Sequence, residues 1–310
     1  MSNFAFVFPG QGSQKIGMLA ELADQNPIIE KTFSEASEVL GYDMWQLIQQ
    51  GAQEDINLTQ RTQPILLTCS VAIWRLWNQK QGAKPSQMAG HSLGEWSALV
   101  CANVIDFADG LKMVEARGKF MQQAVPVGQG AMAAIIGLDD KAILAACTEA
   151  STLGVVDAVN FNAPGQVVIA GANDAVERAM DICKAAGAKR ALPLPVSAPF
   201  HTSLMKPAAD NLAEMVNTIT FRAPEVPVMH NVHAKNEHDP QAIKALMLEQ
   251  IYSPVKWVDC VEQLKDSGVS ALVECGPGKV LSGLAKRIDR ELIAISTESV
   301  TDFDAALTTI

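Results

Sequence analysis

The sequence predicts an α/β protein with a large discontinuous domain and a smaller domain inserted into it. The chain has 310 residues, long enough for one large domain that carries a smaller one. Hydrophobic residues make up 48% of it and charged residues only 19%, which excludes a disordered or collagen-like chain. Short apolar runs of strand length alternate with segments of helical periodicity, as is typical of helices packed on a sheet.

The first part of the chain begins with a strand. Residues 4–8 are an apolar run that Pro9 and Gly10 end, as expected for a buried strand entering a loop. Asp106 is a suitable N-cap for a later helix, and Asp109 falls in its first turn. In order, we expect strand 4–8, helix 27–40 stopped by Gly41, a helix from Thr62 or Pro64 to Gln81 with Gly82 as its C-cap, strand 87–90, helix 92–101 and a helix from Asp106 to about Ala124.

Residues 131–196 have the pattern of a separate unit. We expect strand 132–136, helix 139–150, strand 155–161, strand 166–170, helix 174–186 and strand 189–195. This strand-helix-strand-strand-helix-strand order is that of the split βαβ, or ferredoxin-like, motif. Gly128-Gln129-Gly130 and the segment from Pro195 to Pro199 provide hinges on either side.

Helix and strand patterns resume after this unit. They predict further elements at 211–216, 226–232, 242–251, 258–267 and 271–274. The large domain is therefore expected to comprise residues 1–127 and 197–310, with residues 128–196 as the ferredoxin-like insertion.

The charge balance disfavours two classes of partner. Lys and Arg number 24 against 34 Asp and Glu, a net charge of −10. Nonspecific binding to nucleic acid or to anionic membranes depends on basic surface, so we expect neither partner. No apolar run approaches the ~18 residues of a membrane span, and the N-terminus lacks a secretory pattern, so we expect a cytoplasmic protein.

Six cysteines are scattered through the chain without a CxxC pair or a Cys/His cluster. Most lie in apolar runs, where a free cysteine packs as a small hydrophobic residue. The pattern predicts neither a disulfide framework nor a metal site, and it fits a reducing compartment.

Gly90-His91-Ser92-Leu93-Gly94 has the G-x-S-x-G pattern, with a strand expected before it and a helix after it. In that context the serine lies on a sharp turn with its Oγ exposed, and the helix N-terminus favours developing negative charge. The backbone N–H of Leu93 would be one oxyanion donor. A simple glycine-rich strand-to-helix turn is the alternative.

A nucleophilic serine needs a base, and the chain has five histidines. His91 adjoins the serine, so its side chain is expected to point elsewhere. Solvated histidines are common in polar loops, which is where we place His230, His233 and His238. His201 follows a proline-containing loop at the edge of the insertion, and a loop histidine held by rigid neighbours suits general-base catalysis.

Arg117 shares a helical face with apolar residues such as Val114 and Met121. A buried arginine is costly unless a carboxylate pairs with it. That partner could be Glu115 or Glu95, the side chain could extend to water, or it could bind a substrate carboxylate. The sequence leaves these readings open.

Two glycine-rich segments resemble nucleotide-binding loops. Residues 9–14 follow a strand, but Gly17 is misplaced for a dinucleotide fingerprint, and no acidic residue ends a second strand at the required distance. Residues 276–279 lack the P-loop spacing and are expected to be a turn before the final helix. We therefore reject NAD binding and read 9–14 as a tight loop whose N–H groups face a site.

Seven ordered motifs resemble those of the bacterial malonyl-CoA:acyl carrier protein transacylases. The resemblance covers nearly the whole chain. The motifs are Phe8-Pro9-Gly10-Gln11-Gly12-Ser13-Gln14, Thr62-Gln63-Pro64, Gly90-His91-Ser92-Leu93-Gly94-Glu95, Arg117-Gly118-Lys119-Phe120-Met121-Gln122, Asn160-Phe161-Asn162, Ser197-Ala198-Pro199-Phe200-His201 and Glu274-Cys275-Gly276-Pro277-Gly278. The family's fold is an α/β-hydrolase-like domain with an inserted ferredoxin-like domain, in agreement with the division above.

The resemblance implies a role for each matched residue. Ser92 is the nucleophile that becomes a malonyl ester. His201 is the base that activates it and the acid that protonates the departing thiol. The backbone N–H groups of Gln11 and Leu93 form the oxyanion hole, and Arg117 binds the malonyl carboxylate.

Further roles follow from the same resemblance. A main-chain carbonyl near Gln250 orients the histidine, and Phe200 is the family's usual mark of malonyl over methylmalonyl preference. The cleft between the domains is lined by Gln63, Asn160 and Asn162. Trp96 departs from the family, whose members more often have tyrosine there, and this could alter nearby packing.

The implied reaction is a ping-pong transfer from malonyl-CoA to the phosphopantetheine thiol of acyl carrier protein, without metal or redox cofactor. The protein is expected to be a monomer. Carrier proteins are typically acidic, as is this chain, so their docking requires a local basic patch. The candidates for that patch are Lys189, Arg190, Lys286 and Arg287.

Three other functions compete with this one. A serine esterase or thioesterase shares G-x-S-x-G but requires an acid on a strand-end loop of the main sheet, and the acids between Ser92 and His201 are expected in helices or in the insertion. A noncatalytic carrier-binding module would have little reason to retain Ser92, His201 and Arg117. A freestanding polyketide-pathway acyltransferase is poorly separated by sequence alone.

Overall fold

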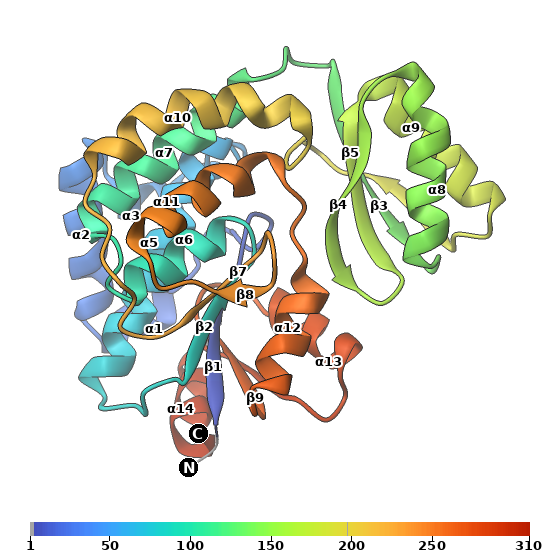
Figure 1. The fold of residues 1–310 in the computed structure, drawn as a ribbon. Helices are drawn as coiled ribbons and strands as arrows, with labels where there is room; N and C mark the ends of the chain where they lie inside the picture. The colour runs from blue at the N-terminus through green and yellow to red at the C-terminus, as the bar shows by residue number, and fades with distance from the viewer. Residues whose placement is uncertain (1–2, 197) are drawn as a thin grey trace.

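The computed structural model describes residues 3–196 and 198–310 and shows a mixed α/β molecule built on two sheets (Figure 1). Ser197, the first residue of the predicted histidine loop and of the second large-domain segment, lies outside the described residues.

A six-stranded sheet forms the centre of the larger part. Four of its five strand pairings are parallel, and the fifth, between the last two strands in the order given next, is antiparallel. The strand order is β10 (Ile293–Ser296), β9 (Ala271–Glu274), β1 (Phe4–Phe8), β2 (Gln87–Gly90), β7 (Val228–His230) and β8 (Lys235–Asn236).

Strand β1 shows why this sheet is covered on both faces. All five of its residues are buried, and alternate side chains enter different cores because strand side chains alternate between faces. The three phenylalanines pack into a core with α5 (Thr59–Gln79), where the Phe6 ring meets Trp77 edge to face at 5.1 Å. Ala5 and Val7 face a second core formed with α12 (Trp257–Asp266) and α13 (Val280–Ile288).

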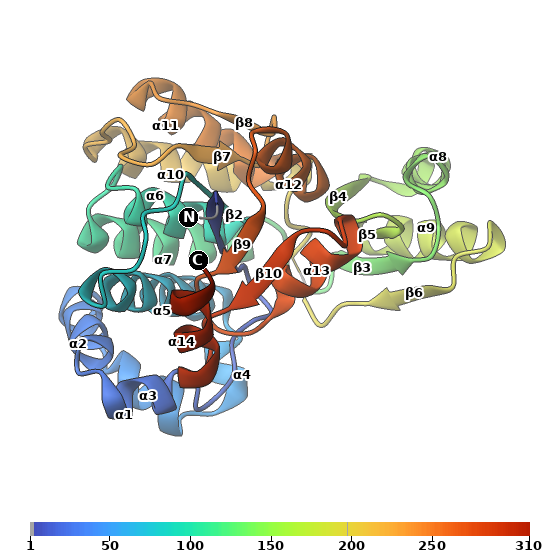
Figure 2. The ribbon, with the colours of Figure 1, turned by 90° about the horizontal axis from the view of Figure 1, so that it is seen from below.

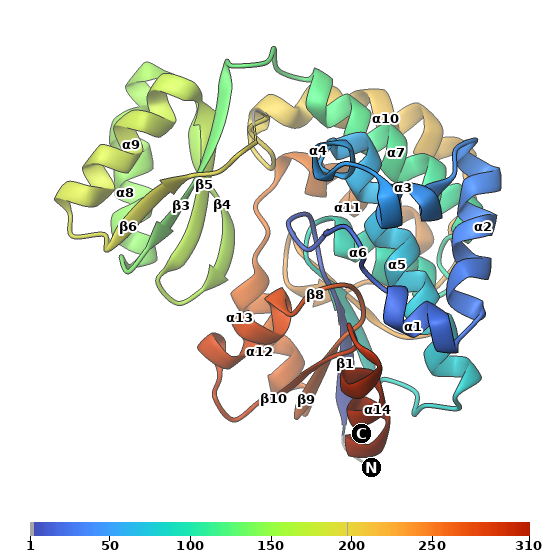
Figure 3. The ribbon, with the colours of Figure 1, turned by 180° about the vertical axis from the view of Figure 1, so that it is seen from behind.

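Helices cover the sheet on both sides, and α2 lies on the far side of the molecule from the four-stranded sheet (Figures 1 and 3). The helices of the larger part are α1 (Ala20–Gln25), α2 (Ile28–Leu40), α3 (Met44–Gln50), α4 (Gln53–Ile56), α5 (Thr59–Gln79), α6 (Leu93–Cys101), α7 (Phe107–Gln123), α10 (Lys206–Thr218), α11 (Pro240–Glu249), α12 (Trp257–Asp266), α13 (Val280–Ile288) and α14 (Val300–Thr309).

The second sheet is antiparallel, has four strands and follows the predicted element order. Helices α8 and α9 pack on it around a separate apolar core (Figure 1). Its strand order is β4-β5-β3-β6. The elements are β3 (Gly130–Ile136), α8 (Asp140–Ala150), β4 (Val156–Ala163), β5 (Gln166–Ala172), α9 (Asn173–Ala185) and β6 (Arg190–Pro193).

Strand β4 is a part of the four-stranded sheet that contacts the larger part. It lies beside α12 and α13 (Figure 2). A short parallel bridge joins Asn160 to Val255, with the Phe161 N–H donating to the Val255 carbonyl at 3.0 Å. Val255 in turn donates to Val159 at 2.8 Å. This bridge ties the four-stranded sheet to the segment that follows α11.

The predicted strands at 4–8, 87–90 and 271–274 are confirmed at both ends. The prediction for α5 is wrong at both ends, since the helix starts at Thr59 and Pro64 lies inside it. At the other end the left-handed residue is Gln81 (φ 57°) rather than Gly82. Gly82 serves close packing instead, because a Cβ there would lie 2.3 Å from the Trp77 ring.

Asp106 occupies the predicted N-cap position of α7, but its side chain does not cap the helix. Both of its carboxylate oxygens instead accept hydrogen bonds from Arg222 at 2.8 Å. Sequence reasoning also missed α1, α3, α4, β10 and the C-terminal α14. The turn at residues 276–279 precedes α13, which is therefore not the final helix.

All six cysteines are free and buried, as the apolar runs around them predicted. Within the described ranges, no helix is both long and apolar enough to cross a membrane.

Candidate active site

Ser92 lies on a strained turn between β2 and α6. Its backbone has φ 52° and ψ −104°, a conformation that non-glycine residues rarely adopt. The flanking glycines make the turn possible, because a Cβ on Gly90 would lie 1.9 Å from the Gly94 carbonyl carbon. A Cβ on Gly94 would lie 1.9 Å from the carbonyl oxygen of Phe8. The strand-to-helix context predicted for the G-x-S-x-G pattern is therefore present.

The structure brings His201 to the serine. Its Nε2 lies 2.7 Å from Ser92 Oγ, and its Nδ1 lies 2.9 Å from the main-chain carbonyl of Gln250. A carbonyl only accepts, so Nδ1 carries the hydrogen and Nε2 is free to accept the serine proton. His201, like Ser92, has a left-handed backbone (φ 65°), and its side chain is buried.

Burial keeps His201 neutral. Loss of solvent, with the nearby positive charge of Arg117 as the second cause, lowers the pKa of His201 to about 3. The imidazole is therefore an unprotonated acceptor at neutral pH, the form that a general base requires.

Arg117 lies directly beside this pair and is only 1% exposed. Its Nη2 donates to Ser92 Oγ at 3.2 Å and to Gln250 Oε1 at 3.0 Å, while Nη1 donates to Gln63 Oε1 at 2.7 Å. Its Nε has no acceptor among the described residues. Burial lowers the pKa of Arg117 to about 10, so it remains a cation at neutral pH.

Two of the alternatives that the sequence left open for Arg117 are wrong. The side chain does not extend to water, since it is buried. None of the ion pairs in residues 3–196 and 198–310 includes it, neither with Glu115 nor with Glu95. Arg117 is a buried cation without a directly paired carboxylate.

The two expected oxyanion donors lie on the loop after β1 and at the first residue of the helix after the serine turn. Leu93 is the first residue of α6, and Gln11 follows β1. A Cβ on Gly10 would lie 2.6 Å from the His91 carbonyl oxygen, so glycine lets this loop approach the turn closely. In the part of the chain that the structure describes, neither the Gln11 nor the Leu93 N–H donates to a protein carbonyl.

The remaining predicted residues surround the centre at different depths. Gln63 is buried and holds Arg117, and Asn160 is buried on β4. Asn162 Oδ1 lies 2.7 Å from His91 Nε2, so the histidine beside the serine points across to β4. Phe200 is 7% exposed and belongs to the main apolar core.

Sequence reasoning missed a buried polar cluster beneath the serine. The placement of His230 in a solvated loop is wrong, because it is fully buried on β7 and its Nδ1 lies 2.7 Å from Glu95 Oε1. Asn231 is also buried, and its Oδ1 accepts from the Ser92 N–H at 2.8 Å. The available signal was a carboxylate in the otherwise apolar helix that follows the serine. Trp96, the departure from the family, is fully buried in that helix.

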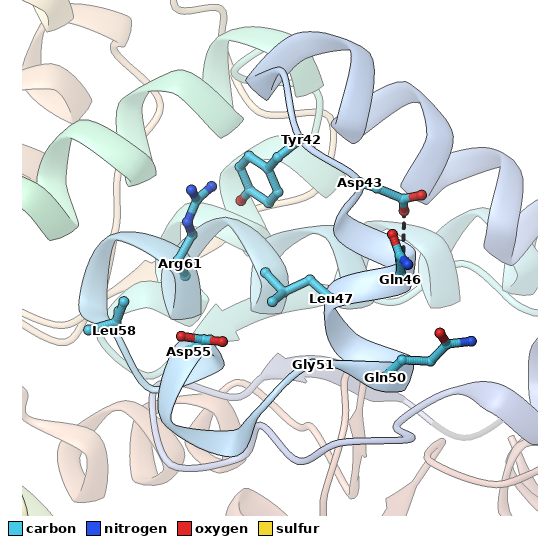
Figure 4. Close-up of a pocket in the computed structure, with 9 residues that line it drawn as sticks. All are labelled: Tyr42, Asp43, Gln46, Leu47, Gln50, Gly51, Asp55, Leu58 and Arg61. Atoms are coloured by element: carbon cyan, nitrogen blue, oxygen red, sulfur yellow. Dashed lines mark hydrogen bonds between the residues drawn. The ribbon is translucent and has the colours of Figure 1, made fainter.

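A cavity of about 570 Å³ lies elsewhere, between α3, α4 and the start of α5 (Figure 4). There the Arg61 guanidinium stacks 3.8 Å above the centre of the Tyr42 ring, and Asp43 caps α3 through the Gln46 N–H. None of the residues that line it belongs to the Ser92 centre.

Fold and site place the protein among enzymes that move acyl groups. The chain belongs to the acyl transferase family: the family model described as acyl transferase domain matches residues 5–299.

Within that family, the resemblance predicted from the motifs is confirmed. The malonyl CoA-acyl carrier protein transacylase of Salmonella typhimurium is 60% identical over 308 residues, which cover 99% of this chain and 100% of that protein. The protein of the same name from Bacillus subtilis is 44% identical over 311 residues, covering 100% and 98%.

Solved structures of proteins with related names are similar to this chain over nearly its whole length. An acyl carrier protein S-malonyltransferase from Vibrio cholerae superposes with a TM-score of 0.96 at 60% identity, over 98% of this chain and 99% of that one. A malonyl-transacylase in complex with a type II PKS acyl-carrier protein gives a TM-score of 0.98 at 56% identity, over 100% of both chains.

Proposed function

We propose that this protein transfers the malonyl group of malonyl-CoA to the phosphopantetheine thiol of acyl carrier protein, through a malonyl-Ser92 ester, and supplies fatty acid biosynthesis. The observation that carries the proposal is Arg117. It is a buried cation that no carboxylate of the described residues pairs with, and its Nη2 lies 3.2 Å from Ser92 Oγ. A carboxylate on the acyl group would pair with the Arg117 guanidinium and accept hydrogen bonds from its N–H groups.

In the first half-reaction Ser92 Oγ attacks the thioester carbonyl as its proton passes to His201 Nε2. The oxyanion that forms is stabilised by the N–H groups of Gln11 and Leu93. The tetrahedral intermediate then collapses, the carbon–sulfur bond breaks, and the Nε2 proton goes to the CoA sulfur. The Gln250 carbonyl, which accepts from Nδ1, stabilises the imidazolium during this step.

The second half-reaction reverses these roles. The carrier thiol gives its proton to His201 Nε2 and attacks the ester carbonyl, after which Ser92 leaves and regains a proton from Nε2. The reaction requires no metal or redox cofactor.

The histidine's partner favours transfer over a hydrolase. In a Ser-His-Asp site a carboxylate orients the base, whereas here a main-chain carbonyl does so. A neutral partner stabilises the imidazolium less, and this contributes to discrimination against water. Phe200 precedes the base in the chain, and we propose that it narrows the site for branched acyl groups such as methylmalonyl.

We propose that acyl carrier protein docks, as a transient partner of a monomer, on Lys189, Arg190, Lys286 and Arg287. Arg190 pairs with Ile136 across β6 and β3, and Ile136 pairs with Gln166 across β3 and β5. Arg287 donates to the Gln166 side chain. All four cations are exposed, and these contacts place Arg190 and Arg287 at one end of the four-stranded sheet.

Charge reversal tests that docking surface. Lys286→Glu and Arg190→Glu should raise KM for the carrier protein severalfold while KM for malonyl-CoA changes little. Lys80→Glu, on the C-terminal side of α5, is the matched control. Equal effects of all three variants, or none, would remove the patch.

We also propose that residues 1–127 and 197–310 form one α/β-hydrolase-like domain and residues 128–196 an inserted ferredoxin-like domain. The separate sheets and the separate apolar core around α8 and α9 support this division.

Intact mass spectrometry tests the transfer itself. The protein is mixed briefly with malonyl-CoA and then with holo acyl carrier protein, with acetyl-CoA and Ser92→Ala in parallel. We expect a malonyl adduct that Ser92→Ala lacks and that passes to the carrier. An adduct that decays to free malonate in the presence of the carrier would instead identify a hydrolase, and equal labelling by acetyl-CoA would remove Arg117 from the specificity argument.

A further inference from the structure

Four fully buried polar residues lie beneath the serine turn, and only the main-chain carbonyl of one of them takes part in the proposed reaction steps. They are Glu95, His230, Asn231 and Gln250, referred to here as the Glu95 cluster. Glu95 belongs to α6, one turn after the nucleophile, and the other three come from β7, the residue after it, and the segment after α11.

Glu95 is the centre of this cluster. Its Oε1 faces His230 Nδ1 at 2.7 Å, and its Oε2 accepts from the Asn231 N–H at 3.1 Å and from Gln250 Nε2 at 2.8 Å. Each of these partners can donate, and the buried His230 Nε2 has no partner among the described residues. These contacts are satisfied when His230 Nδ1 carries a hydrogen and both Glu95 oxygens accept.

One arm of the cluster holds the nucleophile. The Asn231 side chain spans the serine turn, because its Oδ1 accepts from the Ser92 N–H and its Nδ2 donates to the Gly90 carbonyl, both at 2.8 Å. The Asn231 main chain is itself fixed by Glu95. A strained turn persists only when its surroundings fix it, and these bonds do so.

The other arm holds the base and the cation. Gln250 donates from Nε2 to both Glu95 and the Ser92 carbonyl, each at 2.8 Å. An amide whose NH₂ faces a carboxylate must direct its oxygen the other way, and Oε1 accepts from Arg117 at 3.0 Å. The same residue's main-chain carbonyl accepts from His201.

We propose that Glu95 is a positioning residue that fixes the Asn231 and Gln250 amides and, through Gln250, directs the amide oxygen that keeps Arg117 oriented for an acyl carboxylate. A single carboxylate then fixes the positions of Ser92, His201 and Arg117. The Arg117 part of this inference rests on the proposed function, whereas the Ser92 part does not.

The test is Glu95→Gln, with Glu274→Gln as the matched control. Glu274 is an equally buried carboxylate, and it accepts from the Leu281 and Ser282 N–H groups and from Ser282 Oγ at 2.8–3.0 Å. It lies at the end of β9, outside the serine centre. Both variants remove one charge from a buried site with several donors, so a general loss of stability should appear in both.

We expect Glu95→Gln to lower kcat/KM for malonyl-CoA by about 10²-fold, since small misplacements of reacting groups cost this much. The value for acetyl-CoA should fall less, so the malonyl-to-acetyl ratio falls. Glu274→Gln should leave the ratio unchanged. In an Arg117→Ala background Glu95→Gln should no longer alter the ratio, because its effect on selectivity acts through that cation. Equal ratios in the two carboxylate variants would overturn the proposal.

Two further measurements keep the inference testable if the first variant folds poorly or the malonyl assignment fails. Gln250→Met removes the amide link but keeps the carbonyl that faces His201, and it should reduce the ratio in the same way. A fluorophosphonate that labels nucleophilic serines reports the Ser92 arm without any acyl-CoA. Slower labelling of Glu95→Gln than of Glu274→Gln supports this arm, and equal rates contradict it. Fast labelling of the unaltered protein without a malonyl adduct would refute the proposed function alone.

Discussion

The two sheets of this protein are stabilised in different ways. Helices α8 and α9 cover the four-stranded sheet with apolar stripes at helical spacing, such as Ile143, Ala146 and Cys147. Among the described residues between 130 and 193, Asn160 is the one buried polar side chain, and it lies where β4 meets the larger part. This sheet is held together by ordinary apolar packing.

The carboxyl end of the six-stranded sheet is built from groups that are costly to bury. Glu95, Arg117 and His201 are all buried there, and two residues with left-handed backbones face one another. Such a region is stable because most of its polar groups have partners and the surrounding cores hold it, although Arg117 Nε and His230 Nε2 have no partner among the described residues. We therefore expect substitutions in the four-stranded sheet to reduce stability, and substitutions at the carboxyl end of the six-stranded sheet to reduce activity first.

His201→Gln should give the largest effect. It removes the proposed base while leaving a polar side chain in the same place, so transfer of malonyl should slow by about 10²–10⁴-fold. Single-turnover labelling of Ser92, followed by intact mass, measures this, and urea denaturation shows whether the fold is retained. A variant that labels at the normal rate would mean that another group activates the serine.

Arg117→Met should be next. Loss of a charge-assisted contact to the acyl carboxylate should reduce kcat/KM for malonyl-CoA by about 10–10²-fold, with little loss for acetyl-CoA. Arg222→Met is the control. Arg222 is likewise hydrogen-bonded through its guanidinium, with two bonds of 2.8 Å to the exposed Asp106, but it lies outside the site. If both variants shift the malonyl-to-acetyl ratio alike, Arg117 has no special role in substrate choice.

The same contrast explains what the sequence predicted. Every strand and helix of the four-stranded sheet could be predicted from periodicity and turn residues, because the apolar positions there serve only to pack the core. In the site, motif context indicated Ser92 and His201, yet the surroundings of Arg117 stayed open. Its partners Gln63 and Gln250 come from distant segments, and their approach depends on tertiary structure.

His230 shows the limit most clearly. A histidine in a polar stretch is usually solvated, and only the arrival of Glu95 from α6 makes its burial possible. The end of α5 was misplaced for a related reason, since the packing of Gly82 on Trp77 is a contact that local turn preferences do not register.

The pH dependence of acylation should also separate the site from an ordinary histidine. Because burial and Arg117 lower the pKa of His201 to about 3, the base stays neutral where an exposed histidine would be protonated. Acylation at about pH 5 should therefore retain most of its rate, where an ordinary histidine would lose about thirtyfold. Rates of Ser92 labelling across the acid range measure this, and an acid limb near the usual histidine pKa would contradict it.

The lowered pKa has a consequence for stability as well. His201 binds a proton at the ordinary histidine pKa in the unfolded chain but only at a much lower pH in the folded chain. Its contribution to the free energy of unfolding is therefore complete above the ordinary histidine pKa and is lost as the pH falls toward the pKa of the folded state. His201→Gln removes this dependence. The unfolding free energy of the variant should change less between neutral and mildly acidic pH than that of the unaltered protein.

The smallest effect is expected from Ile169→Val in the four-stranded sheet. Ile169 is fully buried on β5 between Ala133 and Ala158, so loss of one methylene should cost about 1 kcal/mol of unfolding free energy. The malonyl-to-acetyl ratio should not change, because the site's charges lie on other elements. If the ratio does change, the bridge from β4 to Val255 transmits packing to Gln250, and the two sheets cannot be treated as independent regions.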